Sequence, residues 1–274
     1  MVIPKKILKK LYINEKLSSW DIGEKLNISR STIFKKLKEF RLIRDRATAH
    51  IVYPKKDFNG DLKEKFYLIG FRIGDLRVRK QYENSKTICI ACSSTIPEQI
   101  ELIEGLFKKY GRVWIKKSRD KKVIHSEAFV NESFNFLLEK KVPENLLKTK
   151  LNFFSFLAGF IDAEGHIGVY NKMARFSLGN YDSRALFFIY EKLNEFGINC
   201  NKPLSDNRKG KMNSQGYKYN QDYWHFNINR KDELLKLFVF IEPYLKHKNK
   251  IKDLNKAEKN ILERNKKFGL KLKR

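Results

Sequence analysis

The chain has 274 residues, of which 42% are hydrophobic, so it can form a folded core and disorder is excluded as the default. Lysine and arginine total 58 against 31 acids, which gives a charge of +27. This excess favours a protein that binds a polyanion over a typical metabolic enzyme or a protein whose basic surface serves only solubility. No apolar run approaches the ~20 residues of a membrane-spanning helix, and the start MVIPKKILKK lacks the apolar segment of a signal peptide.

The three cysteines imply no disulfide framework, so we expect an intracellular protein of the cytoplasm, the nucleoid or an organelle. Cys89 and Cys92 lie three apart in the strand-like TICIACSST and would point to opposite faces. This favours buried thiols over a zinc site.

Residues 18–44 predict two helices joined by a tight turn. Ser18 or Ser19 can cap the first helix and Ser29 the second, and each helix repeats an apolar residue four positions apart. The stretch resembles the helix-turn-helix family, with a plain helical hairpin as the alternative. The resemblance implies that polar side chains of the second helix face a DNA major groove: Arg30, Ser31, Thr32, Lys35 and Lys36. We expect this module to span 1–46, followed by a linker at 47–61.

An internal repeat organises the rest of the chain, in FYLIGFRIGDLRV (66–78) and SFLAGFIDAEGHI (155–167). Small residues four apart share one helix face, so two such helices can pack closely. In each copy an acid follows the second small residue directly: Gly70, Gly74 and Asp75, then Gly159, Ala163 and Glu164. Packing through these faces would set the two acids side by side.

The elements after each helix also correspond. The first helix precedes strands near 77–82 and 86–93, a helix at 97–110, strands within 112–130 and a helix from 133. The second precedes strands near 166–171 and 174–180, a helix at 183–196, a basic hairpin, the strand YWHFNIN and a helix from 231. Both units read αββαββα, with bounds of 62–148 and 149–250, and 251–274 forms a basic helix or tail.

The letters LAGFIDAEG (157–165) and LIGFRIGDL (68–76) resemble the LAGLIDADG homing endonucleases in their single-chain, two-repeat form. The second copy departs only conservatively, whereas the first departs at Arg72, Ile73 and Leu76. The resemblance covers roughly 62–250. It implies an α+β fold in which two pseudo-symmetric αββαββα repeats form a saddle-shaped DNA-binding surface, in a monomer.

The resemblance implies site-specific hydrolysis of both strands of DNA at a long recognition site. Asp75 and Glu164 would bind Mg²⁺ or a similar divalent cation, one ligand from each repeat. Lys231 would lie near the attacking water, unless it is a solvated lysine at a helix start. Asp182 is interpreted as a helix cap in preference to a water-network residue. In the first repeat Glu132 and Ser133 stand where the lysine would be, so the two strands could be cut at unequal rates.

DNA contacts are expected from alternate residues of the strand after each acid and from two basic hairpins. The strand positions are Arg77, Arg79 and Gln81 in the first repeat, and His166, Tyr170 and Lys172 in the second. The hairpin positions are Lys116, Lys117 and Arg119 within 115–122, and Arg208 and Lys211 within 206–218.

Three alternatives use the same scaffold. The degraded first motif favours a catalytically inactive DNA-binding regulator, although both acids are retained. An RNA maturase that binds its own intron stays open, because positive charge does not separate DNA from RNA. An intein-embedded nuclease is disfavoured, since the sequence starts at Met1 and ends LKLKR without protein-splicing residues.

Overall fold

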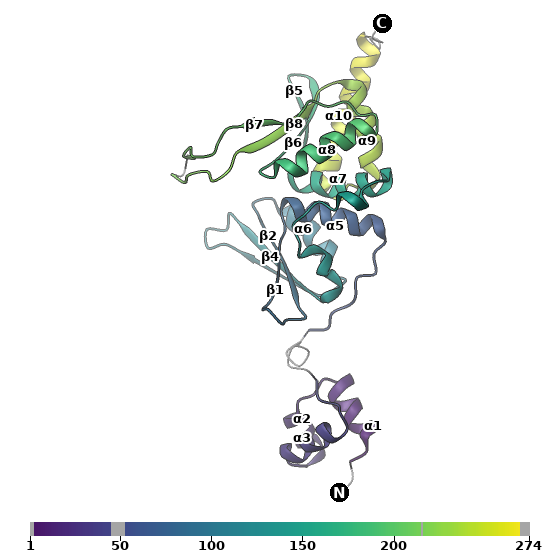
Figure 1. Cartoon of the computed structure of the whole chain (residues 1–274), viewed down its shortest axis with the longest axis vertical. Coiled ribbons are helices and arrows are strands. Elements are labelled where there is room, and N and C mark those ends of the chain that lie inside the picture. Colours follow the sequence, from purple (N-terminus) through teal and green to yellow (C-terminus); the bar gives the residue numbers. More distant parts are fainter. Residues whose placement is uncertain (1–2, 45–52, 215, 269–274) are drawn as a thin grey trace. The chain divides into compact units, whose positions relative to one another are not determined.

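The computed structural model describes residues 3–44, 53–214 and 216–268 (Figure 1). They form two compact units, Met1–Pro54 with Gln81–Thr87, and Lys55–Lys80 with Ile88–Arg274, called here the N-terminal and the main unit. Positions 47–52 of the expected linker and 269–274 of the tail lie outside the described residues. In the described ranges, no helix has both the length and the apolar character needed to span a membrane.

The N-terminal unit is a small helical bundle. Its helices are α1 (Lys5–Leu8), the π-helical turn η1 (Lys9–Asn14), α2 (Ser19–Leu26) and α3 (Arg30–Glu39). Ser18 accepts a hydrogen bond from the Asp21 N–H while the Asp21 carboxylate accepts from the Ser18 N–H, a reciprocal capping box. Ser29 caps α3 by accepting from the Thr32 N–H, so the caps expected from the sequence are confirmed.

The first half of the main unit is one four-stranded antiparallel sheet with its helices. Strand order is β1-β2-β4-β3. The α-helix predicted from 133 is instead a short 3₁₀-helix, Glu132–Leu137, which buries Phe134 and Leu137. The elements are α5 (Leu62–Gly74), β1 (Arg77–Lys80), β2 (Ile88–Ser94), α6 (Pro97–Phe107), β3 (Arg112–Lys117), β4 (Ile124–Val130), η2 (Glu132–Leu137) and η3 (Glu144–Leu146).

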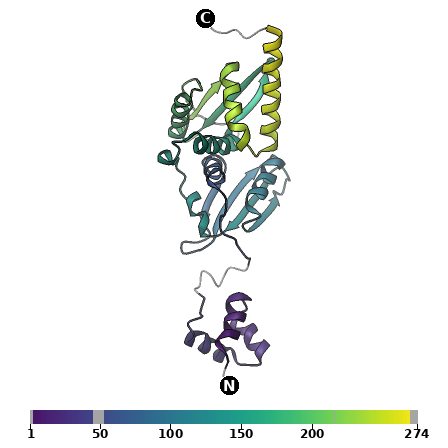
Figure 2. The same cartoon turned by 90° about the vertical axis from the view of Figure 1, so that its right-hand side faces the viewer.

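The second half repeats the topology, with strand order β5-β6-β8-β7. Figure 2 shows α9 and α10 running along this sheet, and both contact β6. The elements are α7 (Lys150–Glu164), β5 (His166–Tyr170), β6 (Met173–Asn180), α8 (Ser183–Glu195), β7 (Leu204–Asp206), β8 (Tyr223–Ile228), α9 (Lys231–Ile241), η4 (Glu242–Tyr244) and α10 (Lys248–Phe268).

The two halves meet where α5 packs on α7 (Figure 1). A methyl group at Gly70 would overlap the backbone carbonyl of Phe156, and one at Gly159 would overlap that of Tyr67. Only glycine therefore allows the helix backbones to touch at these points. The close packing expected from the small residues is confirmed.

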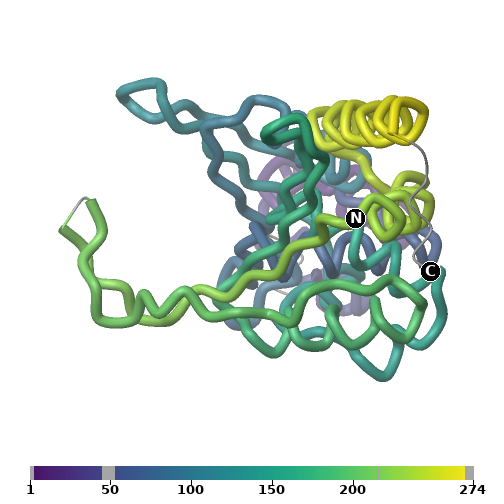
Figure 3. The backbone as a smooth tube through the Cα atoms, turned by 90° about the horizontal axis from the view of Figure 1, so that it is seen from above, coloured from purple at the N-terminus to yellow at the C-terminus, as the bar shows by residue number. Residues whose placement is uncertain are grey.

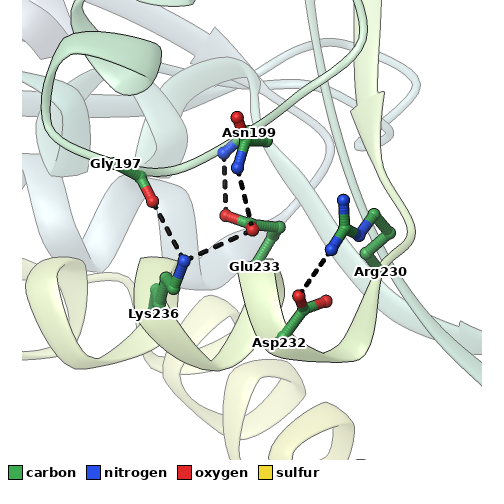
Figure 4. Close-up of polar contacts among 6 residues, drawn as sticks. All are labelled: Gly197, Asn199, Arg230, Asp232, Glu233 and Lys236. Carbon is green, nitrogen blue, oxygen red and sulfur yellow. Dashed lines mark hydrogen bonds and ion pairs between the residues drawn. The ribbon is translucent and has the colours of Figure 1, made fainter. Parts of the chain in front are cut away.

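A buried carboxylate fixes the base of the long β7–β8 hairpin. Glu233, at the start of α9, accepts from the backbone N–H of Asn199 (2.7 Å), from its side-chain amide (3.1 Å) and from Lys236 (3.3 Å) (Figure 4). Lys236 also donates to the Gly197 carbonyl. These bonds hold the segment between α8 and β7, and Figure 3 shows this hairpin and β3–β4 projecting from the main unit.

Candidate functional site

Two carboxylates lie at the ends of the paired helices. Asp75 directly follows α5, and Glu164 is the last residue of α7. The protein packed around Asp75 raises its pKa to about 6, although the side chain keeps contact with solvent. Burial and, after it, the nearby charge of Asp75 raise the pKa of Glu164 to about 7. The acids are therefore close enough to interact electrostatically.

Each acid has a buried amide partner. Gln99 of α6 donates to Asp75 Oδ2 at 2.7 Å, and Asn180, at the end of β6, donates to Glu164 Oε1 at 3.1 Å. Both amides are at most 7% exposed. Sequence reasoning missed both amides. Gln99 lies in the first turn of the helix after β2, and Asn180 is the last residue of β6, so a search for Asn or Gln near the end of the second strand of each repeat would have found them.

Lys250, on α10, places a cation beside the acid pair. Its ammonium donates to the Gly165 carbonyl, next to Glu164. Its charge opposes the rise in pKa of Asp75 and Glu164, as does the charge of Lys140. Burial lowers the pKa of Lys250 itself. Sequence reasoning did not identify this lysine.

The two candidate water-network residues of the second repeat have other partners. The Lys231 ammonium, at the start of α9, donates to Asn265 Oδ1 on α10 at 2.7 Å. Asp182 accepts from the Ala185 N–H and caps α8, as expected.

A third carboxylate, Asp162, ties α7 to the start of α10. Its Oδ2 accepts from the Tyr67 hydroxyl (2.6 Å) and from the backbone N–H groups of Lys246 (2.7 Å) and His247 (3.0 Å). Burial nevertheless raises the pKa of Asp162 to about 6. Since Lys250 follows one helical turn later, this anchor sets where its ammonium lies.

The donor set at the acid pair suits a hard divalent cation. Within the described ranges, no three His, Cys, Asp or Glu side chains converge as a complete metal site. Two carboxylate ligands with water and phosphate oxygens in the remaining positions are what Mg²⁺ uses in many phosphoryl sites. Asp75 and Glu164, whose mutual repulsion a cation would relieve, therefore fit such an ion.

Strand positions expected to contact DNA divide into two groups. Arg77 and Arg79 lie on β1 with buried Val78 between them, and His166 and Tyr170 lie on β5. Arg79 forms an ion pair with Glu127 of β4 at 2.9 Å. Gln81 and Lys172 lie outside the strands: Gln81 follows β1, and Lys172 is in the β5–β6 turn with a φ of 63°.

The remaining expected DNA-contact residues are on hairpins and on α3. Lys116 and Lys117 end β3, and Arg119 follows in the turn. Arg208 pairs with Asp206 (2.6 Å) and lies over the Tyr223 ring, while Lys211 is exposed farther along that hairpin. On α3 the side chains of Arg30, Ser31, Thr32 and Lys35 are exposed, whereas Lys36 is half-buried and bonded to Glu39.

The chain resembles solved structures of two homing endonucleases and of one further LAGLIDADG domain. The homing endonuclease I-DmoI in complex with DNA and calcium superimposes with a TM-score of 0.50 at 15% identity, over 71% of this chain and 98% of that one. The fold is the two-repeat LAGLIDADG fold. I-WcaI bound to its DNA recognition sequence (TM-score 0.47, 19% identity, 70% and 86% covered) and the N-terminal LAGLIDADG domain of WhiA (0.46, 15%, 69% and 87%) are also similar. No protein-family model matches the sequence.

In this LAGLIDADG fold, the departures of the first motif are accommodated in the core. Arg72 is buried and donates to the backbone carbonyls of Leu137 and Leu76. Ile73, which stands where the second copy has Asp162, is fully buried, as is Leu76. The substitutions in the first motif thus leave α5 intact, with Asp75 at its C-terminal end.

Proposed function

We propose that the protein is a divalent-metal-dependent, site-specific endonuclease that cuts both strands of DNA. The observation that carries the proposal is the pair Asp75 and Glu164, held at the ends of two helices in backbone contact, with an amide on each acid and Lys250 beside them.

Asp75 and Glu164 would hold Mg²⁺, which supplies activation of water and stabilisation of the leaving oxygen when bound. Gln99 and Asn180 fix the orientation of the carboxylates, since each donates to one oxygen and leaves the other free for a ligand. Lys250 supplies a positive charge near the phosphate that reacts. In this assignment it takes the role expected of Lys231.

Duplex DNA would lie across a saddle formed by one face of each sheet. Arg77 and Arg79 of the first sheet and His166 and Tyr170 of the second would contact it there. The hairpins would bind phosphates through Lys116, Lys117, Arg119, Arg208 and Lys211, and Gln81 and Lys172 would contribute from turns. We propose the domain bounds expected above, with 1–46 as a second DNA-binding module whose α3 presents Arg30, Ser31, Thr32 and Lys35. The DNA in the I-DmoI structure and the charge of +27 support a duplex partner.

A cleavage assay on a randomised duplex library, with Mg²⁺ and with EDTA, tests the proposal. We expect Mg²⁺-dependent cut ends at one long site, lost in Asp75→Asn and Glu164→Gln while binding survives. Glu195→Gln, at an exposed acid paired with Lys192, is the matched control and should keep cutting. Cutting by either acid variant would refute the assignment.

The departures at Arg72 and Ile73 favour one other function, a DNA-binding regulator without catalysis. Enrichment of a duplex with no cut ends would support that reading. If no duplex is enriched, the intron RNA maturase becomes the candidate, to be tested by binding to structured RNA.

A further inference from the structure

Each sheet leaves one face outside the hydrophobic core, and strand register shows which residues share it, because directly opposed residues lie on the same side. In the first sheet Arg77 is opposite Ala91, and Arg79 is opposite Cys89. In the second sheet His166 is opposite Ser177, and Tyr170 is opposite Met173. These residues and those in register with them on the other strands are called here the first and the second open face.

The first open face is rich in cations. One row across the sheet begins with Arg79, passes Cys89 and Phe129, and ends with Arg112. The Arg79 guanidinium is held on this face by Glu127. Trp114, 40% exposed, lies between two cations of β3. The charged residues of the face are four cations and one carboxylate: Arg77, Arg79, Arg112, Lys116 and Glu127.

The second open face has fewer charges and exposes two large side chains, Tyr170 and Met173. Its charged residues are Arg175 and Asp206. The opposed pair Tyr170 and Met173 is 45% and 48% exposed. The Tyr170 ring turns back over Gly168, where a Cβ would meet it, and its hydroxyl bonds to His166. The Tyr170 ring thus covers the strand at Gly168 and remains partly exposed.

The difference falls at matched positions of the two repeats. Two and four residues after the acid, the first repeat has Arg77 and Arg79, and the second has His166 and Gly168 covered by Tyr170. An arginine can donate two hydrogen bonds to guanine O6 and N7, whereas an apolar side chain distinguishes thymine by its 5-methyl group.

We propose that the two open faces read chemically different DNA half-sites: the first selects guanines through Arg77 and Arg79, and the second selects thymine methyl groups through Tyr170 and Met173. The inference rests on the proposed function, because it requires DNA on both faces. The DNA target would then be asymmetric: one half would be recognised by hydrogen bonds to guanine, and the other by apolar contacts with thymine methyl groups.

Deoxyuridine substitution tests the inference, because it removes only the 5-methyl group of thymine. A duplex enriched from the randomised library in EDTA is remade with deoxyuridine in one half at a time, and its Kd is measured by fluorescence anisotropy. Substitution in the half over β5 and β6 should weaken binding about fourfold per contacted methyl, the value of one buried carbon. Substitution in the other half should change it less than twofold.

Variants assign the halves and supply the control. In the half that is insensitive to deoxyuridine, replacing a contacted guanine should raise the Kd of the parent protein. In Arg77→Ala that increase should be about tenfold smaller. Met173→Ala should lower the sensitivity of the other half to deoxyuridine. Val169→Ala, which removes an exposed side chain of β5 from the opposite side of the same sheet, should leave that sensitivity unchanged.

The two possible failures differ. If a duplex is enriched but both halves respond equally to deoxyuridine, or if the Met173 and Val169 variants behave alike, the inference is overturned and DNA binding stands. If no duplex is enriched, the proposed function fails and the inference fails with it.

Discussion

Gly159→Ala should separate the two motif helices and destabilise the main unit. A helical alanine in place of glycine contributes about 1 kcal/mol of stability by itself. Here, however, the added methyl group overlaps the backbone carbonyl of Tyr67, which has no rotamer into which it can move. Moving the helices apart by ~1 Å forfeits a quarter to a half of the dispersion energy of each atomic contact along the interface. We expect a net loss of about 2–4 kcal/mol in the free energy of unfolding.

Gly105→Ala is the matched control for this change. Gly105 also lies within a helix, α6, but a methyl group there would meet no atom within 4 Å. Its substitution should therefore raise the stability by about 0.5–1 kcal/mol. Urea unfolding followed by circular dichroism measures both variants against the parent. Stabilisation by both substitutions would refute the backbone contact between α5 and α7.

Three further predictions concern activity and binding. Because the pKa values of Asp75 and Glu164 are raised to about 6 and about 7, both are protonated at low pH, so Mg²⁺-dependent cutting should rise between pH 5.5 and about 8; a flat single-turnover pH profile would contradict this. Lys250→Met should slow cutting about 10- to 100-fold without weakening DNA binding. Lys256→Met, at an exposed lysine of the same helix, should leave the cutting rate unchanged. Equal cutting rates for the two variants would remove Lys250 from the site. If about eight phosphates are neutralised, log affinity should fall against log salt with a slope of about −7, and a flat response would remove the polyanion argument.

The sequence was sufficient to predict the elements whose signals are local. Small residues four apart predicted the helix contact at Gly70 and Gly159, and Ser18 and Ser29 predicted caps that the structure contains. The α+β repeats followed from one motif found twice. The 3₁₀-helix at Glu132–Leu137 was missed, since its burial of residues three apart also occurs in an α-helix.

The surroundings of the acid pair were harder to predict because they depend on packing between distant segments. Gln99 is 24 residues from Asp75, and Lys250 is 85 residues from the carbonyl to which it donates. Lys231 was chosen by its position after a strand, but α10 supplies Asn265 as its partner. A search for lysines on every helix packed against the second sheet would have included Lys250.

The anchoring of α10 by Asp162 has a consequence for synthesis. Both carboxylates and the strands of both four-stranded sheets precede α10 in the chain, yet Lys250 and the two backbone donors that bind Asp162 are translated after them. Domains fold as units once their segments have left the ribosome. Because α10 also packs on β5 and β6 and buries Leu254, Ala257 and Ile261, the second sheet and the proposed site would be completed together, when the last part of the chain has emerged and docked.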